Sequence, residues 1–186
     1  MRSILPCTKH PTYFEWYYGR KEKFSYAGCL VHGKIDRIDI NPATNRAIVI
    51  DYKTSVGADY DAHAVNAPAF SLPTKVQAYI YAKAVQDLLG HMIAAILYIN
   101  PLKGEIRGAY DSSAIDPGML PGLANYKRCT VPFADIGSVE EMLSSIEAEI
   151  EPRLEKYKQG VISCDPRYKY ACRYCAVTRC EERLSS

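Results

Sequence analysis

The sequence has little of several features that mark other classes of protein. Its 186 residues contain no stretch close to the roughly 20 consecutive apolar residues that a membrane-spanning helix needs. The N-terminal segment mixes proline, lysine, histidine and aromatic side chains, which is not the pattern of a signal peptide. The chain also has no glycine-rich loop of the kind that cradles phosphates, so we expect no ATPase or helicase motor within these residues.

The sequence also has a low net charge and no regular spacing of its cysteines. The formal net charge is only +2, so any surface that attracts nucleic acid would have to be local. The seven cysteines are an odd number with uneven spacing, which argues against a secreted disulfide framework and for metal or cluster ligation in a reducing compartment. We therefore expect a cytoplasmic protein with no membrane association.

The length and the order of patterned segments suit one domain. We expect it to span residues 1–186, with residues 161–186 as a cysteine-rich C-terminal tail. The patterns predict five strands, at residues 24–31, 34–40, 47–53, 92–99 and 105–110, and two helices, at residues 73–89 and 138–160. This order indicates an α/β fold with a mixed sheet.

The two predicted helices carry recognisable internal signals. In the first, Val76, Ile80, Ala84 and Leu88 recur every four residues and predict the buried stripe, and a glycine ends the helix. The second starts at the capping box 138–141, and a proline at position 152 should kink or interrupt it. Residues 55–70 lack periodicity and predict a mobile loop over the site.

Two neighbouring strands carry charged residues at their ends. The segments read Gly33-Lys-Ile-Asp-Arg-Ile-Asp39 and Ile48-Val-Ile-Asp-Tyr-Lys-Thr54. Residues two apart on a strand share a face, so Asp51 and Lys53 should project together, with Asp36 on the adjacent antiparallel strand. Carboxylates in a half-buried sheet are costly unless they are paired, and their hard oxygens suit Mg²⁺ or Mn²⁺.

This constellation predicts hydrolysis of phosphodiester bonds. Asp36, Asp51 and the backbone carbonyl of Tyr52 would bind the metal, and Lys53 would supply a cation or position the attacking water. The alternative is a structural ion pair, either Asp51 with Lys53 or Asp36 with Arg37. On the opposite face from Asp36, we expect Arg37 and Asp39 to pair with each other.

The motifs in order resemble the PD-(D/E)XK nuclease superfamily, specifically its RecB/AddB-like branch. That branch combines a G-x-I-D-R-x-D strand, a D-Y-K-T strand and a helix with Q-x-x-x-Y, which here reads Gln77-Ala-Tyr-Ile-Tyr81. The resemblance implies a restriction-endonuclease-like mixed sheet flanked by helices, DNA as substrate and Mg²⁺ or Mn²⁺ as cofactor. It also implies that Gln77 and Tyr81 orient Lys53 or contact the scissile strand; the alternative is simple packing of the helix on the sheet.

The resemblance extends from about Glu15 to the C-terminus. The family carries an acidic residue in a helix before the first strand, and Glu15 lies at a suitable distance for that role. The implied activity is that of a deoxyribonuclease in DNA repair or recombination, with exonuclease action favoured and a helicase subunit or domain as partner.

The C-terminal cysteines form a C-x2-C-x4-C pattern. Cys172, Cys175 and Cys180 have a spacing that can close around one metal or cluster. The resemblance implies a [4Fe–4S] cluster completed by a distant N-terminal cysteine, for which Cys7 is favoured over Cys164. In the family that ligand lies in an upstream helical segment with a Cys-Pro-type motif that this sequence lacks, which is compatible with a domain cut from a longer protein.

Other interpretations remain open for the tail and for the whole chain. Zinc could be held by Cys7 and His10 together with Cys172 and Cys175, or the tail could be free of metal. A module that binds DNA ends without cleaving them is one alternative to the nuclease. A zinc-stabilised interaction domain, in which the acidic strands are only structural, is another.

Overall fold

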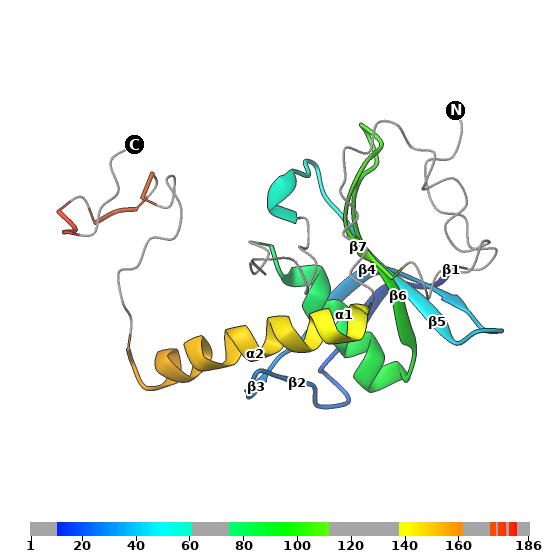
Figure 1. Cartoon of the computed structure of the whole chain (residues 1–186), viewed down its shortest axis with the longest axis horizontal. Helices are drawn as coiled ribbons and strands as arrows, with labels where there is room; N and C mark the ends of the chain where they lie inside the picture. Colours follow the sequence, from blue (N-terminus) through cyan, green and yellow to red (C-terminus); the bar gives the residue numbers. More distant parts are fainter. Residues whose placement is uncertain are drawn as a thin grey trace.

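The computed structural model describes residues 11–60, 75–111 and 138–161, together with residues 172, 173, 175–177 and 179–181. The strands are β1 (Pro11–Tyr18), β2 (Ser25–Tyr26), β3 (Cys29–Leu30), β4 (Gly33–Asn41), β5 (Arg46–Tyr52), β6 (Met92–Asn100) and β7 (Glu105–Tyr110). The helices are the short 3-10 helix η1 (Ala58–Tyr60), α1 (Gln77–Leu89) and α2 (Val139–Lys158). Figure 1 shows these elements in sequence colours.

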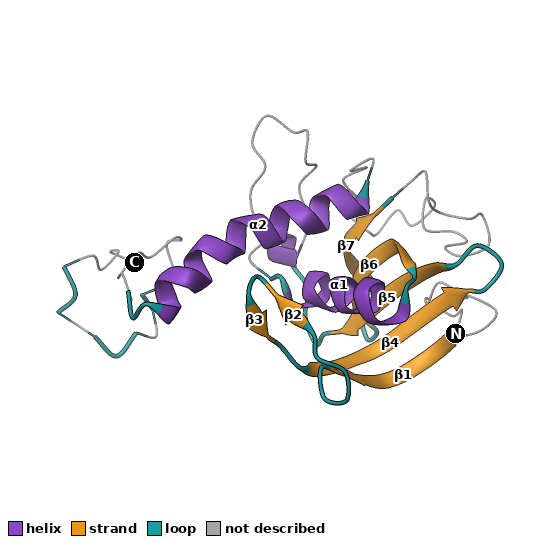
Figure 2. Ribbon diagram, turned by 90° about the horizontal axis from the view of Figure 1, so that it is seen from below, coloured by secondary structure: helices purple, strands orange, loops and turns teal. Residues whose placement is uncertain are grey.

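Five strands form one mixed sheet in the order β1-β4-β5-β6-β7. β4 runs antiparallel to both β1 and β5, β5 and β6 run parallel, and β7 returns antiparallel to β6. Along the chain, α1 lies between the two parallel strands, and both helices pack on one side of the sheet (Figure 2). The α/β fold with a mixed sheet flanked by helices, and the antiparallel pairing of the two acidic strands, are therefore confirmed.

Alternating side chains divide the sheet between two apolar clusters. Ala47 and Val49 of β5 join the cluster that contains residues of α1 and α2, whereas Ile48 and Ile50 join the cluster on the opposite face. This is the period-two pattern of a strand that is buried on both sides. The alternation determines which face the residues after Ile50 will occupy.

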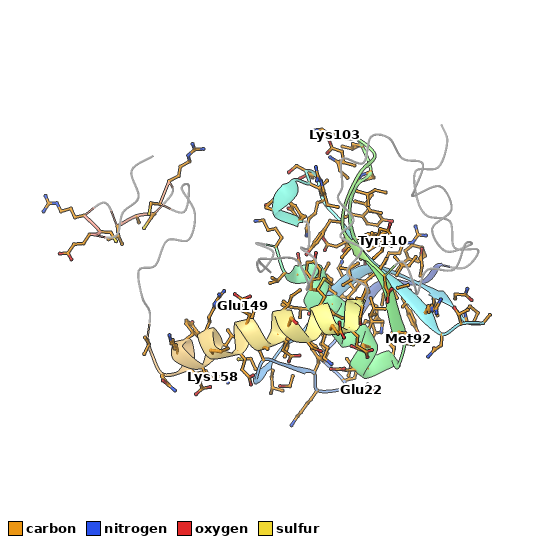
Figure 3. All side chains as sticks on the ribbon, viewed as in Figure 1. Glu22, Met92, Lys103, Tyr110, Glu149 and Lys158 are labelled. Atoms are coloured by element: carbon orange, nitrogen blue, oxygen red, sulfur yellow. The ribbon has the colours of Figure 1, made fainter. Side chains whose placement is uncertain are left out.

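Local signals set the ends of several elements, as the sequence predicts for both helices. Asn45 has a positive φ of 55° in the turn between β4 and β5. α1 ends at Gly90, whose φ of 70° allows its N–H to donate to the carbonyl of Gln86. The hydroxyl of Ser138 accepts the N–H of Glu141 at 3.3 Å and caps α2. Met92 starts β6 and Lys103 lies in the turn before β7 (Figure 3).

The predicted strand over residues 24–31 is wrong in its extent. The structure has two strands of two residues each, β2 and β3, which pair as a hairpin. Ala27 and Gly28 between them have φ values of 48° and 71°. Two successive residues with positive φ make the tight turn that a two-residue hairpin loop requires, so the chain reverses there.

The family carries its acidic residue in a helix, whereas Glu15 lies in the edge strand β1. Aromatic residues surround it and favour an extended chain. Tyr13 and Trp16 both pack against the core, while Phe14 and Tyr17 are exposed. Glu15 has a φ of 50°, and this positive value marks the point where the alternation along β1 is reset.

The helices differ from the predictions in two details. Of the predicted stripe, α1 fully buries only Ala84; the other residues that it buries are Ala78, Tyr79, Tyr81, Ala82 and Val85. The small alanines suit the face that lies against the sheet, and the larger Ile80 and Leu88 are only partly buried. α2 runs without interruption through Pro152, which is exposed, so water can reach the backbone carbonyl that loses its partner there.

Residues 55–60 of the predicted mobile loop include η1, and residues 61–74 lie outside the described residues. Among the helices that the structure describes, none is both long enough and apolar enough to cross a membrane.

Candidate active site

An open cleft of about 680 Å³ lies where β5 ends and α1 begins. Its walls include Lys53 after β5, Gln77 and Tyr81 on α1, and the exposed residues His32 and Lys75. Because Lys53 follows the alternation of β5, it emerges on the same face as α1. The cleft therefore brings the D-x-K and Q-x-x-x-Y motifs to one place.

Asp51 and Lys53 are in direct contact, as residues two apart on one strand can be. The ammonium nitrogen of Lys53 lies 2.6 Å from Oδ2 of Asp51. Asp51 is only 3% exposed, and Lys53 is less deeply buried. Burial raises the pKa of the Asp51 carboxyl above its ordinary value, the charge of Asp36 adds to the rise, and the contact with Lys53 opposes it.

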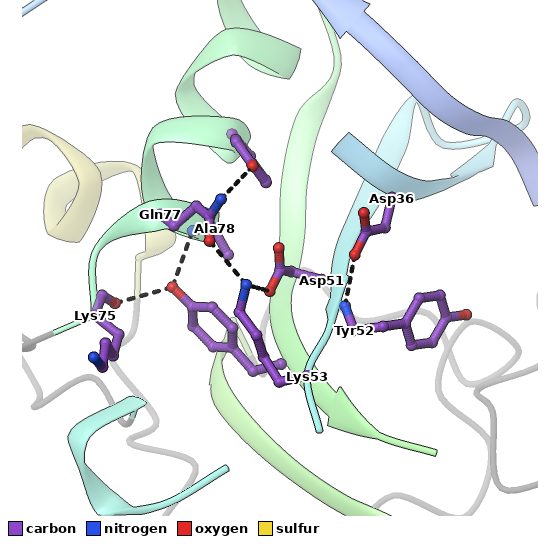
Figure 4. A network of polar contacts seen from close by, with 9 residues as sticks. Asp36, Asp51, Tyr52, Lys53, Lys75, Gln77 and Ala78 are labelled. Carbon is purple, nitrogen blue, oxygen red and sulfur yellow. Dashed lines mark hydrogen bonds and ion pairs between the residues drawn. The ribbon is translucent and has the colours of Figure 1, made fainter. Parts of the chain in front are cut away.

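Asp36 reaches the same region from β4. Its Oδ2 accepts the backbone N–H of Tyr52 at 2.9 Å, which ties the carboxylate to the end of β5 (Figure 4). The side chain of Tyr52 points away from Lys53 in that view, as the sequence predicts. Its hydroxyl accepts a long hydrogen bond of 3.4 Å from Arg37, which is paired with Asp39 as expected.

Gln77 links the lysine to the helix. Its Oε1 accepts a hydrogen bond of 2.8 Å from Nζ of Lys53, and its Nε2 donates at 2.6 Å to the hydroxyl of Tyr81. Residues four apart on a helix share a face, which explains how both motif residues reach the strand. Lys53, Gln77 and Tyr81 thus form one hydrogen-bonded chain, and the ion pair of Lys53 joins it to Asp51.

Tyr81 is deeply buried. It is 7% exposed and belongs to the core cluster, where its ring meets that of Tyr18 edge to face. Burial raises the pKa of the Tyr81 hydroxyl, and the charge of Asp51 adds to the rise. The hydroxyl is therefore neutral near pH 7 and keeps its proton for hydrogen bonding.

The candidate metal ligands Asp36 and Asp51 are few, but their carboxylate oxygens suit a hard divalent cation. Asp51 is a buried carboxylate whose ionised form is opposed both by burial and by the charge of Asp36. A divalent ion between the two carboxylates would relieve that cost, and a carboxylate can accept one hydrogen bond and still bind a cation. Across residues 11–60, 75–111 and 138–161 and the described tail positions, no group of three or more His, Cys, Asp or Glu side chains could hold a metal ion.

Glu15 lies on β1, and its side chain pairs with Lys34 instead of joining Asp36 and Asp51. Its Oε1 accepts from Nζ of Lys34 at 2.7 Å, and its side chain is 68% exposed. Lys34 stands two residues before Asp36 on β4, so Glu15 borders the site from the edge strand. Its catalytic role stays a prediction.

The C-terminal cysteines lie in the described part of the tail as free thiols. The backbone N–H of Cys175 donates to the carbonyl of Cys172 at 3.3 Å, so these two residues share one turn. Cys180 is also described, whereas Cys7, His10 and Cys164 lie outside the described residues.

Among the cleft residues to which the sequence assigns no role, two meet at the start of α1. Lys75 precedes α1, and Tyr98 lies on β6, where it is the register partner of Asp51 across the parallel strand pair. The sequence contains one signal for Tyr98, because parallel pairing of the two apolar strands would place it beside the D-x-K motif.

The chain belongs to the PD-(D/E)XK nuclease superfamily, because the model of that family matches residues 8–180, nearly its whole length. No curated protein matches the sequence. The restriction-endonuclease-like fold that the motifs imply is therefore confirmed by the match together with the mixed sheet. Nucleases of this superfamily generally use Mg²⁺ or Mn²⁺ and act on DNA.

Proposed function

We propose that this protein is a metal-dependent deoxyribonuclease of the RecB/AddB type that cleaves DNA from its ends during repair or recombination. The observation that carries the proposal is that Lys53 pairs with Asp51 and is held by a hydrogen bond to Gln77, with Asp36 tied to the end of the same strand. A structural ion pair alone would not require a helix residue to hold the lysine over an open cleft.

The residues divide into two roles in this proposal. Asp36, Asp51 and the carbonyl of Tyr52 would hold Mg²⁺ or Mn²⁺, which when bound polarises the scissile phosphate and lowers the pKa of an attacking water. Lys53 presents its ammonium to the phosphate oxygens, where charge develops during cleavage. Gln77 orients the ammonium through Oε1, and Tyr81 fixes the amide of Gln77 by accepting from Nε2.

Cleavage of end-labelled linear DNA in Mg²⁺ or Mn²⁺ tests this proposal. We expect Asp51→Ala and Lys53→Ala each to lower kcat by at least about 100-fold, because each removes a group that acts on the reacting phosphate. Lys83→Ala is the matched control, since Lys83 forms an exposed pair with Asp87 on α1 and its loss should leave cleavage unchanged. Cleavage that persists in both site variants contradicts the proposal.

One observation favours a second candidate, a module that binds DNA ends without cleaving them. The described residues offer only two carboxylates at the site, and one of them already contacts Lys53. Binding of labelled DNA ends without cleavage, unchanged in Asp51→Ala, supports that candidate and argues against the nuclease.

We also propose that Cys172, Cys175 and Cys180, with Cys7, hold a [4Fe–4S] cluster. The C-x2-C-x4-C pattern and the shared turn of Cys172 and Cys175 support it. Anaerobically purified protein should contain about four iron atoms per chain, and Cys175→Ala should lose them. One zinc and no iron would instead favour the zinc-stabilised domain.

A further inference from the structure

Tyr98 lies between β5, which carries Asp51, and the start of α1, which carries Gln77. It lies on β6 opposite Asp51 of β5, and its side chain is fully buried. From there its hydroxyl reaches the start of α1, where it accepts the N–H of Ala78 at 2.9 Å and donates to the carbonyl of Lys75 at 2.9 Å. The two bonds end at the labelled Lys75 and Ala78 in Figure 4.

These bonds replace a helix cap that α1 does not supply itself. The first N–H groups of a helix have no partner within the helix and are usually satisfied by a side chain at the N-cap. Here the N-cap residue is Val76, which forms no side-chain cap. The hydroxyl of Tyr98, from a strand of the sheet, satisfies a first-turn N–H instead.

The anchored residues flank Gln77 on both sides. Because Tyr98 binds the backbone at Lys75 and at Ala78, it sets where Gln77 stands above the sheet. Gln77 in turn accepts a hydrogen bond of 2.8 Å from the ammonium of Lys53. The position of the lysine therefore depends on a hydroxyl that contacts neither substrate nor metal in the proposed reaction.

We propose that Tyr98 is a positioning residue, whose hydroxyl pins the start of α1 so that Gln77 holds Lys53 toward the scissile phosphate. The catalytic part of this inference rests on the proposed nuclease function. Tyr98 lies outside the D-x-K and Q-x-x-x-Y motifs.

The neighbouring aromatic rings keep Tyr98 in place and provide a matched control. The ring of Tyr60 meets that of Tyr98 edge to face with centroids 4.7 Å apart, and the ring of Tyr79 lies 6.3 Å away. Tyr98→Phe retains these ring contacts and removes only the hydroxyl. Tyr79→Phe removes the hydroxyl that donates to the carbonyl of Tyr60 at 3.1 Å and does not touch the bonds at Lys75 or Ala78.

Hydrogen exchange of backbone amides tests the anchoring without any assay of activity. We expect the amide of Ala78 in Tyr98→Phe to exchange about five-fold faster, measured against amides of β5, because its hydrogen bond is lost. In Tyr79→Phe the same ratio should stay within about two-fold of wild type. Equal exchange in wild type and Tyr98→Phe overturns the inference.

Kinetics of DNA cleavage test the link to Gln77. We expect Tyr98→Phe to lower kcat about 10-fold with KM within about two-fold, because a misplaced catalytic group slows the chemical step. In a Gln77→Ala background the further loss should disappear, since the two residues act through one contact. If Tyr98→Phe lowers kcat by the same factor in the Gln77→Ala background as in the wild type, the positioning role is overturned.

The two measurements also separate this inference from the proposed function. A wild-type protein that does not cleave DNA in Mg²⁺ or Mn²⁺ overturns the nuclease and the catalytic role of Tyr98 together. The exchange of the Ala78 amide still supports or overturns the anchoring of α1 in that case.

Discussion

At the scale of single residues, Asp51 combines a buried position with a negative charge that its surroundings oppose. Its pKa is raised by burial and by the charge of Asp36, and the contact with Lys53 compensates only in part. A carboxyl group with a raised pKa in the folded state destabilises that state once it ionises. Residues of an active site commonly reduce stability in this way.

Asp51→Asn should therefore stabilise the metal-free protein at neutral pH. We expect Tm to rise by about 2–4 °C, or about 1 kcal/mol for a chain of this size. The folded state holds this proton more tightly than the unfolded chain. Wild-type stability therefore falls as pH rises from the ordinary Asp pKa of about 3.9 to the raised value, and the gain in the variant develops over that window. Thermal melts across pH measure it.

Adding Mg²⁺ should remove this advantage. If Asp36 and Asp51 hold the ion as proposed, it would bind and stabilise the folded wild type, whereas the variant lacks one of the two carboxylates. Asp87→Asn is the control, because Asp87 forms an exposed pair with Lys83 and should shift stability by less than about 0.5 kcal/mol. A Tm for Asp51→Asn below that of metal-free wild type at pH 7 would refute the argument.

At the scale of elements, the pairing of β6 with β7 depends on one glycine. Gly108 lies opposite Leu97 with a φ of 126°. A Cβ added at this position would overlap the carbonyl oxygen of Ile96. The strand that carries Tyr98 therefore keeps its neighbour only if position 108 has no side chain.

Gly108→Ala should destabilise the protein by more than about 3 kcal/mol, because the new methyl group collides with backbone as well as adopting a strained φ. Gly90→Ala is the matched comparison, since Gly90 also has a positive φ but a Cβ there meets no atom within 4 Å. Its cost should be only about 1 kcal/mol. Urea denaturation of both variants measures the difference, and equal costs would argue against the collision.

At the scale of the whole molecule, α2 contacts the β2–β3 hairpin at two points along its length. Oε1 of Glu147 accepts the N–H of Ala27 at 2.8 Å, and Nζ of Lys158 donates to the carbonyl of Gly28 at 2.9 Å. Both contacts hold the turn of the β2–β3 hairpin. The chain continues from this hairpin into Val31 and His32, which line the cleft.

Glu147→Ala should loosen the hairpin and weaken substrate binding. We expect a loss of about 1–2 kcal/mol in stability and a rise in KM of about three-fold, with kcat within about two-fold. Glu149→Ala is the control on the same helix, because its pair with Arg153 is partly exposed and contributes less than about 0.5 kcal/mol. A fall in kcat at unchanged KM would contradict this role.

Much of the site could be predicted because its geometry is local. Asp51 and Lys53 share a face by strand alternation, and Gln77 and Tyr81 share one by helix periodicity. The same alternation predicts the pair of Arg37 with Asp39, which the structure contains. These patterns need no knowledge of the rest of the chain.

Other features depend on contacts between residues far apart in the sequence. Glu15 lies in a strand because β1 pairs with β4, and the chain turns at Ala27 within what reads as one strand. The depth of Tyr81 follows from the aromatic side chains that pack around it. Local periodicity carries no information on such neighbours.

Tyr98 shows this difference most clearly. Its pattern in the sequence is that of a core residue, and it is indeed buried. Its hydroxyl gains a role only because parallel pairing of β5 and β6 places it beside Asp51 and because α1 starts directly above it. Short-range alternation brings the candidate catalytic side chains to one face, whereas packing of a helix on a sheet sets the distances between them.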